Sequence, residues 1–440
     1  MRISYRFYIA CIFIGTITGF VCVSFRYLIN KANLLRINTF TDDHLNISDI
    51  LYLVSKYLIL FIITTIILNV VSEIVKKYPT TSGSGLPQTR ALLEKKMEYK
   101  SPFKNIVAKF FGGILSISSG LSFGREGSSV QMGSLIGYIF GKSLKVEKEN
   151  DNYLIAAGAG AGISAAFTAP LASSILILES LRNDNTSNIK KLTISTLLSG
   201  LCAGIVAIYF FPTNIYSSIT ITKPELRQDQ LLLVFIIMSI IFALFGKLFS
   251  NLLILIKSKY EGVRQRYDRH YYLLALLICA ITFLYPSLIG GNQAFCIEII
   301  EDNNFSIIVN MLIITVLSTI TILSNATGFP GGLFIPLLSI GGLLGKIFCI
   351  VLSKLDLVSL DCTGYFVLIG MSVLFISVVR TPLTGFILIS EMTGNYDVMI
   401  PTLITGIMAY IITEIIRVRP IDDILYDIMI KKINTHSSYS

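Results

Sequence analysis

The sequence predicts an all-α membrane protein that crosses the bilayer several times and consists of two related halves. Three observations support this prediction: an apolar composition, a series of long apolar segments and an internal repeat. Of the 440 residues, 53% are hydrophobic and only 14% are charged, whereas a soluble domain carries about 25% charged residues. Because nearly every segment is apolar, little of the chain remains for a separate soluble domain.

The formal net charge of +9 does not indicate a nucleic-acid partner. The basic residues gather in short polar connections, for example 90–100, 142–148 and 257–269. Bacterial inner-membrane proteins show this bias because basic loops stay in the cytoplasm, beside anionic lipid. We therefore expect a multi-pass protein of the bacterial inner membrane, with the lipid bilayer as a partner and no nucleic acid.

Apolar segments follow one another along the whole chain. They lie at residues 5–29, 51–75, 103–123, 129–141, 153–181, 192–211, 231–256, 271–289, 305–323, 332–352, 364–379, 382–391 and 399–416. The first is too long for a signal peptide and contains Arg6 and Arg26, so it is interpreted as a retained helix. Several others reach the roughly 20 residues that a spanning helix needs.

Two of these segments, 129–141 and 382–391, are too short to span the bilayer upright. Short, interrupted segments are tolerated at membrane depth only where protein buries them or where they line a cavity. This observation favours a transporter or channel with broken helices over a simple helical bundle.

Two blocks of sequence recur in the same order. Residues 133–137 (GSLIG) match 341–345 (GGLLG), 208 positions later, and residues 169–179 match 381–391, 212 positions later. The chain is therefore divided into halves 1–220 and 221–440, and the pattern leaves open whether they are parallel or inverted. Interrupted segments at corresponding places in two halves point to a central substrate site.

Three glycine-rich breaks, at 82–87, 124–128 and 328–336, each precede a predicted helix. The free N–H groups at a helix start carry a partial positive charge, and glycine lets an anion approach them closely. Ser84 adds a hydroxyl donor in the first break. Several helix starts directed at one point would bind an anion without a full positive charge.

Glu126 lies inside the second break, next to Arg125. In the repeat, residues 124–128 (GREGS) align with 332–336 (GLFIP), which carry no charge. The fold therefore does not require an acid at this place. Since charged groups inside a bilayer usually mark an ion or proton path, Glu126 is predicted to be functional.

Two other classes of function were weighed. An intramembrane serine hydrolase with Ser84 as nucleophile would need a base nearby, but the three histidines, His44, His270 and His436, lie in polar or loop contexts. A cation transporter would place acids, rather than glycines and helix starts, in the breaks. We therefore expect that the protein is not an enzyme and has no catalytic residue.

Metals and cofactors are not expected either. The seven cysteines are scattered, no C-x-x-C pair occurs, and no H-E-x-x-H motif is present. The cysteines are interpreted as small buried apolar side chains.

Taken together, the motifs resemble those of the CLC family of chloride channels and chloride/proton exchangers. The matching stretches, in the family's order, are 83–87 (GSGLP), 109–113 (KFFGG), 124–128 (GREGS), 165–172 (AAFTAPLA), 332–336 (GLFIP) and 391–396 (EMTGNY). They cover about residues 70–430. The resemblance implies two inverted halves whose short, tilted, broken helices meet at a central anion site. It also implies a homodimer with one pore per subunit, which transports chloride and, in the coupled members, protons.

The resemblance also implies roles for individual residues. The hydroxyl of Ser84 would coordinate the anion, and the backbone N–H groups of Leu333 and Phe334 would complete the site. Glu126 would be the gating glutamate, which occupies an anion position when ionised and swings away when protonated. Further backbone contributions to the anion site are expected at Gly83, Gly85, Gly127, Gly332 and Ile335.

The chain departs from the family's pattern near residue 180. Proton-coupled members carry two successive acids there, and the second relays protons. Here Glu179 is followed by Ser180, which cannot relay as an acid. Glu179 itself is expected to form an ion pair with Arg182 at a helix end. Ser180 favours a channel-like or loosely coupled transporter, with a strict chloride/proton antiporter as the alternative.

A second departure concerns the inner gate. The family has a tyrosine shortly after a proline in its last helix, and here Asp422 takes that position after Pro420. Tyr426 lies one helical turn later, on the same face. An ionised aspartate would repel an anion, so Asp422 is expected to point away from the site. Asp422 and Tyr426 are the candidates for the inner gate.

Overall fold

A computed structural model describes residues 5–40, 50–143, 150–181, 186–211, 221–264, 271–291 and 306–437. Within these ranges the chain is helical, apart from turns and one isolated β-bridge. The helices of the first half are α1 (Tyr5–Phe40), α2 (Ile50–Lys77), α3 (Leu86–Leu93), α4 (Pro102–Ser118), α5 (Glu126–Ser143), α6 (Asp151–Phe167), α7 (Pro170–Leu176) and α8 (Ile189–Phe210). Those of the second half are α9 (Gln228–Arg264), α10 (Tyr271–Leu284), α12 (Ile307–Ala326), α13 (Phe334–Lys354), α14 (Thr363–Val379), α15 (Pro382–Thr393), α16 (Met399–Ile415) and α17 (Ile421–Ser437).

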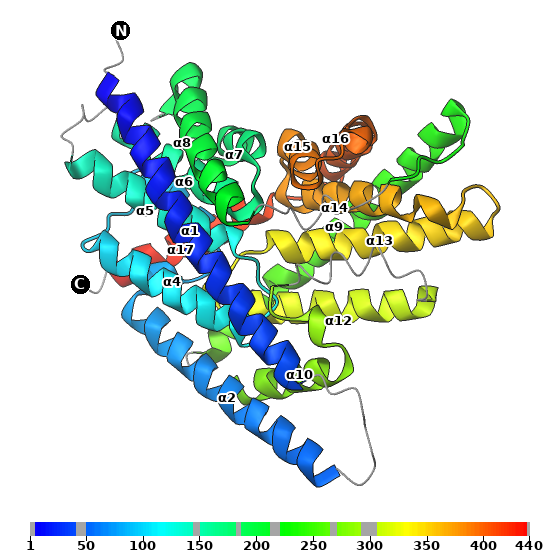
Figure 1. Cartoon of the computed structure of the whole chain (residues 1–440), viewed down its shortest axis with the longest axis horizontal. Coiled ribbons are helices and arrows are strands. Elements are labelled where there is room, and N and C mark those ends of the chain that lie inside the picture. Colours follow the sequence, from blue (N-terminus) through cyan, green and yellow to red (C-terminus); the bar gives the residue numbers. More distant parts are fainter. Residues whose placement is uncertain are drawn as a thin grey trace.

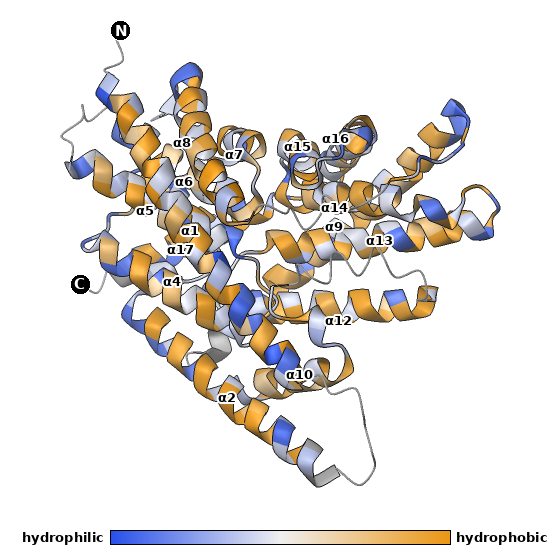
Figure 2. Cartoon of the chain, viewed as in Figure 1, coloured by the Kyte–Doolittle hydropathy of each residue, from blue (hydrophilic) through white to orange (hydrophobic). Residues whose placement is uncertain are grey.

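Eight of the described helices are long and apolar enough to cross a membrane: α1, α2, α8, α9, α12, α13, α14 and α16, the last two together with a preceding 3₁₀ turn. The outer helices are largely hydrophobic along their length (Figure 2). Exposed apolar side chains such as Ile62 on α2 and Leu244 on α9 face outward, as expected of a lipid-facing surface. Short helices such as α7 and α15 lie among the long ones (Figure 1). The predicted all-α fold with broken helices is confirmed.

Glycines bring a corresponding helix pair together in each half. A Cβ added to Gly133 of α5 would lie 2.0 Å from the carbonyl oxygen of Gly158 on α6. A Cβ added to Gly341 of α13 would lie 2.5 Å from the carbonyl oxygen of Gly370 on α14. Because Gly341 is the repeat partner of Gly133, both halves build the same closely packed pair.

The two halves also cap each other's short helices. The carboxylate of Glu179 accepts the backbone N–H groups of Leu383 and Thr384 at the start of α15, at 3.0 and 2.8 Å. The carboxylate of Glu391 accepts the two corresponding N–H groups at the start of α7, at 3.0 and 2.7 Å. Glu179 and Glu391 are partners in the repeat. Such reciprocity is what a two-fold relation between the halves produces.

The cap gives Glu179 a role that the sequence did not predict. Its carboxylate neutralises a helix N-terminus, which is a favourable place for a negative charge. The ion pair predicted with Arg182 concerns a residue that lies outside the described ranges.

The central contact between the halves is the bridge between Gly124 and Gly332. Gly124 N–H donates to the carbonyl of Gly332 at 2.9 Å, and Gly332 N–H donates to that of Gly124 at 2.7 Å. These glycines are 208 positions apart, the offset of the repeat. An antiparallel pair that exchanges both hydrogen bonds has a local two-fold axis, so the inverted halves meet here. The boundary at residue 220 lies beside undescribed residues and remains a prediction.

Candidate anion-binding site

The starts of α3, α5, α13 and α17 converge around a small cavity of about 10 Å³. The residues that line it are Ser84, Leu86, Glu126, Gly127, Asn325, Gly332, Leu333, Phe334, Ile421, Asp422 and Leu425. This volume is about that needed for one water molecule. The cavity is therefore nearly filled by its own side chains, and an anion needs one of them to move.

Glu126 is the side chain that occupies the site. It is 1% exposed, and its Oε1 accepts the backbone N–H of Phe334, the first residue of α13, at 2.7 Å. Its Oε2 has no hydrogen-bond partner among the described residues. The carboxylate thus holds the place that a helix N-terminus offers to an anion.

Gly332 makes room for this carboxylate. A Cβ at Gly332 would lie 2.3 Å from Glu126 Oε1. The uncharged glycine-rich break of the second half therefore accommodates the acid that belongs to the first half.

Ser84 presents a free hydroxyl to the cavity. The residue is 9% exposed, and its Oγ has no hydrogen-bond partner within the part of the chain that the structure describes. The next residue, Gly85, has φ = 100°, which a non-glycine residue rarely adopts, and it starts α3. A Cβ there would lie 2.6 Å from the carbonyl oxygen of Gly127. The loop therefore holds Ser84 against the start of α5.

The predicted backbone positions divide into two groups. Gly127, Gly332, Leu333 and Phe334 line the small cavity. Gly83, Gly85 and Ile335 flank it: Gly83 lines a wider vestibule, Gly85 packs against Gly127, and Ile335 is buried in the first turn of α13.

Lys109 is a charged residue at the site that we did not predict. Its side chain is fully buried, and its Nζ donates to the carbonyl oxygens of Thr81 at 2.9 Å and Gly83 at 2.7 Å. These bonds hold the loop that carries Ser84 in place. A lysine within the apolar segment 103–123 was the available signal, since a charge at membrane depth is seldom without a role.

Arg125, the neighbour of Glu126, bonds to the end of α6. Its guanidinium is buried and donates to the carbonyl oxygen of Ala166 at 2.8 Å. This bond ties the start of α5 to the end of α6. Arg125 therefore positions the helix that carries Glu126.

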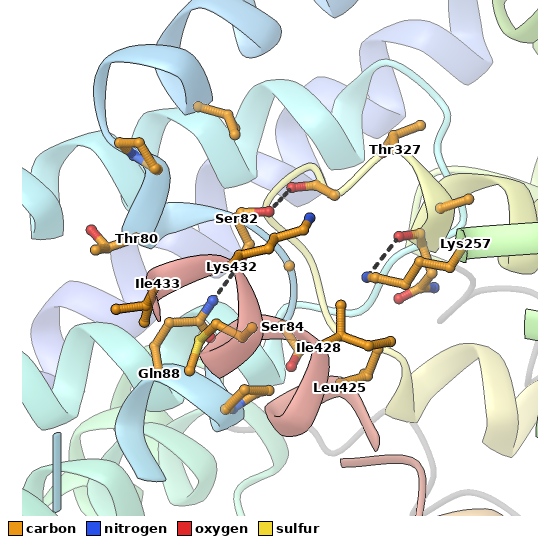
Figure 3. Close-up of a pocket in the computed structure, with 18 of the residues that line it drawn as sticks. Thr80, Ser82, Ser84, Gln88, Lys257, Thr327, Leu425, Ile428, Lys432 and Ile433 are labelled. Atoms are coloured by element: carbon orange, nitrogen blue, oxygen red, sulfur yellow. Dashed lines mark hydrogen bonds between the residues drawn. The ribbon is translucent and has the colours of Figure 1, made fainter. Parts of the chain in front are cut away.

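A vestibule of about 610 Å³ leads to Ser84. Ser84 and Gln88 come from the α3 region, and Leu425, Ile428 and Lys432 come from α17 (Figure 3). The cationic residues along it are Lys76, Lys257 and Lys432. A cavity lined by one sign of charge concentrates ions of the other sign, so this vestibule attracts anions toward Ser84.

A second, polar cavity of about 200 Å³ is lined by Leu86, Pro87 and Arg90 of α3. Its charged and hydroxyl-bearing lining residues are Arg90, Glu179, Ser180, Arg380, Thr381, Asp422 and Asp423. Ser180, the position of the missing relay acid, is therefore brought to the same cavity as Asp422.

Asp422 lines both this polar cavity and the small central cavity. Asp422 therefore lies beside the site, while the direction of its carboxylate stays a prediction. The residue is half-buried. Burial, assisted by the neighbouring Asp423 and opposed by Arg90, raises the pKa of Asp422 to about 7. Its charge, and with it the expected repulsion of an anion, is therefore reduced near neutral pH.

Tyr426 does not line any of these three cavities. Its hydroxyl donates to Glu94 and accepts a hydrogen bond from Lys96 at 3.2 Å, and the guanidinium of Arg90 lies 4.6 Å from its ring centroid. The structure thus places Asp422, and not Tyr426, beside the small central cavity.

The chain was compared with known proteins. A family model described as voltage gated chloride channel matches residues 67–414. The H⁺/Cl⁻ exchange transporter ClcA of Vibrio parahaemolyticus is 30% identical over 421 residues, which cover 93% of this chain and 86% of that protein. ClcA of Vibrio campbellii is 31% identical over 354 residues, or 78% and 73% of the two chains.

Solved structures agree in fold. The crystal structure of a slow cyanobacterial Cl⁻/H⁺ antiporter superposes with a TM-score of 0.89 at 27% identity, over 98% of this chain and 100% of that one. The structure of a CLC-type fluoride/proton antiporter has a TM-score of 0.75 at 21% identity, over 93% and 95% of the two chains. At 21% identity, the similarity to the fluoride/proton antiporter shows a shared fold and nothing more.

Proposed function

The chain belongs to the CLC family of voltage-gated chloride channels, and we propose that it exchanges chloride for protons across the membrane. It is a multi-pass anion-transport protein and not an enzyme. The relatives named above are described as exchangers, and this supports an antiporter. Ser180 alone favoured the alternative, a channel-like transporter.

The observation that carries this proposal is the position of the Glu126 carboxylate on the N–H of Phe334. A carboxylate at this place competes with chloride for the same positive helix end. Protonation removes its charge and weakens its hold, so that chloride can take its place. The Glu126 carboxylate therefore either binds a proton or occupies the helix start where a chloride ion would bind. This competition links the movement of the two ions.

Ser84 and the vestibule supply the chloride path in this proposal. The lysines of the vestibule attract chloride, and the unpartnered hydroxyl of Ser84 lies where the vestibule meets the small cavity. Its hydrogen bond to chloride would replace part of the ion's hydration.

A passive or loosely coupled chloride pathway is the second candidate, and the observation that favours it is Ser180 at the position of the relay acid. The full chain in sealed vesicles distinguishes the two. A chloride gradient is imposed without a proton gradient, and proton movement is followed with a pH electrode. Proton movement opposite to chloride, at a fixed ratio, supports the exchanger. Chloride movement without proton movement overturns it.

We also propose that the protein acts as a homodimer in which each subunit holds its own site, as the resemblance to the family implies. The mass of the protein–detergent complex, measured by light scattering, tests this proposal. A monomer that retains full transport would contradict it.

A further inference from the structure

Two further cavities share lining residues with the central cavity. The vestibule shares Ser84 with it, whereas the polar cavity shares Asp422. Ser84 does not line the polar cavity, and Asp422 does not line the vestibule. Both cavities therefore border the small cavity that holds Glu126, at different residues, and of the two only the vestibule has lysines among its described lining residues.

We propose that Asp422 passes protons between the polar cavity and Glu126, at the place where Ser180 cannot. This inference rests on the proposed chloride/proton exchange and names the residue that carries the proton. Asp422 is suited to this role because it is an acid that borders both compartments.

The other carboxylates of the polar cavity are already engaged. Glu179 accepts the N–H groups at the start of α15, and Asp423 accepts Arg90 Nη1 at 2.5 Å. The side-chain carboxylate of Asp422 makes no hydrogen bond or ion pair with the other described residues. It is thus the acid of this cavity that is available to take up and release a proton.

Burial is the main cause that raises the pKa of Asp422, the neighbouring Asp423 raises it further, and Arg90 lowers it. The charged residues that line the same two cavities come from its own helix (Asp423), from α3 (Arg90), from the segment that continues α7 (Glu179), from the residue after α14 (Arg380) and from α5 (Glu126). Arg90 also pairs with Glu94 at 2.9 Å, and Arg380 pairs with Glu414. The two cations are therefore shared with other carboxylates. A proton donor works best when its pKa lies near the working pH, and that of Asp422 is about 7.

The proposed step conserves atoms and charge. The carboxylate of Asp422 takes a proton from a hydronium ion in the water of the polar cavity and leaves a neutral water molecule. The new O–H bond then breaks as the proton passes to the carboxylate of Glu126, directly or through the one water molecule that the central cavity has room for. Asp422 returns to a carboxylate, and Glu126, now neutral, releases the start of α13.

The test uses the full chain in vesicles, with chloride and proton fluxes measured together. Asp422→Asn keeps the size of the side chain but removes its acid. We expect proton flux to fall by about 100-fold while chloride flux persists, which also reports that the variant is folded. Asp422→Glu is expected to restore proton flux. Asp427→Asn is the matched control, because Asp427 is on the same helix but pairs with Arg419 at 2.7 Å and lies outside the three cavities.

The outcomes separate this inference from the proposed function. If the unaltered protein moves no protons against chloride, the exchanger proposal fails. If it does so and Asp422→Asn keeps the same ratio of protons to chloride, the relay inference alone is overturned. A faster chloride flux at an unchanged ratio would likewise overturn it, because Asp422 would then act only by repelling the anion. Recovery of proton flux in the double variant Asp422→Asn, Ser180→Glu would support the polar cavity as the proton route.

Discussion

Oε1 of Glu126 accepts the backbone N–H of Phe334 at 2.7 Å, so a side chain of the first half closes a helix start of the second half. The repeat explains how they meet, because Gly124 and Gly332, which precede them, are paired across the two-fold axis. The gate is therefore built from two segments about 200 residues apart in the chain. Three changes should therefore have different effects on transport: removing the charge of Glu126, removing a hydrogen-bond donor to the anion, and filling the space at Gly332.

Removing the charge of Glu126 is the first test. Glu126→Gln cannot bind a proton, and its neutral amide competes weakly for the helix start. We expect chloride flux to persist, its dependence on pH to weaken and proton flux to disappear. Glu73→Gln is the control, because Glu73 is an exposed residue of α2 that pairs with Lys76. An unchanged pH dependence in Glu126→Gln would rule out the gating role.

Removing the hydroxyl of Ser84 tests the anion site itself. Since this hydroxyl has no partner among the described residues, Ser84→Ala should cost nothing in folding but should remove a donor to chloride. A loss of about 1 kcal/mol in binding, or roughly fivefold in Kd, is expected. Calorimetric titration with chloride measures it. Ser258→Ala is the control, because the Ser258 hydroxyl bonds to the carbonyl of Leu255 on the surface of α9. Equal affinities in the two variants would contradict the assignment.

Filling the space at Gly332 tests the gate without changing a charge. The added methyl group of Gly332→Ala would lie 2.3 Å from Glu126 Oε1, the end of a flexible side chain. We expect the carboxylate to be displaced, chloride flux to rise and the ratio of protons to chloride to fall. Gly160→Ala is the matched control, since its nearest contact would be an ordinary 3.4 Å. A slower chloride flux with an unchanged ratio would show that the methyl group blocks the path instead.

Much of this arrangement follows from the sequence. The length of the apolar segments predicted the spans, and the glycine-rich breaks predicted helix starts directed at one site. Because the repeat aligned Glu126 with an uncharged stretch, it predicted that Glu126 has a functional role. The helices and the helix starts around one cavity are found in the structure because they depend on local composition and on one comparison between the halves, whereas the function of Glu126 stays a prediction.

Other features depend on contacts that no local pattern encodes. Glu179 caps a helix more than 200 residues away, and a carboxylate near a helix end gives no indication of which helix it will reach. Lys109 bonds to two carbonyls of a distant loop. The pKa of Asp422 also depends on such contacts, because burial in the folded chain raises it to about 7.

The reciprocal caps provide a matched pair of variants. Glu179→Gln and Glu391→Gln each remove a negative charge from the start of a short helix of the opposite half. Each is expected to lower stability by about 1 kcal/mol, measured as thermal unfolding in detergent. Because both residues are structural, the ratio of protons to chloride should stay unchanged in both variants. Loss of proton coupling in Glu179→Gln alone would make Glu179 part of the proton path.

The pKa of Asp422 gives the sign of a pH effect on chloride binding. With a pKa of about 7, Asp422 is mainly neutral at pH 6 and mainly ionised at pH 8. The ionised form adds a negative charge beside the anion site, so chloride affinity should fall as the pH rises through this range. Glu126→Gln is the background for the measurement, because it removes the other carboxylate of the cavity. In that background, calorimetry at pH 6 and pH 8 should show weaker binding at pH 8, and adding Asp422→Asn should abolish the difference. If the difference survives in the double variant, another group near the site titrates, and Asp422 is not the source of the effect.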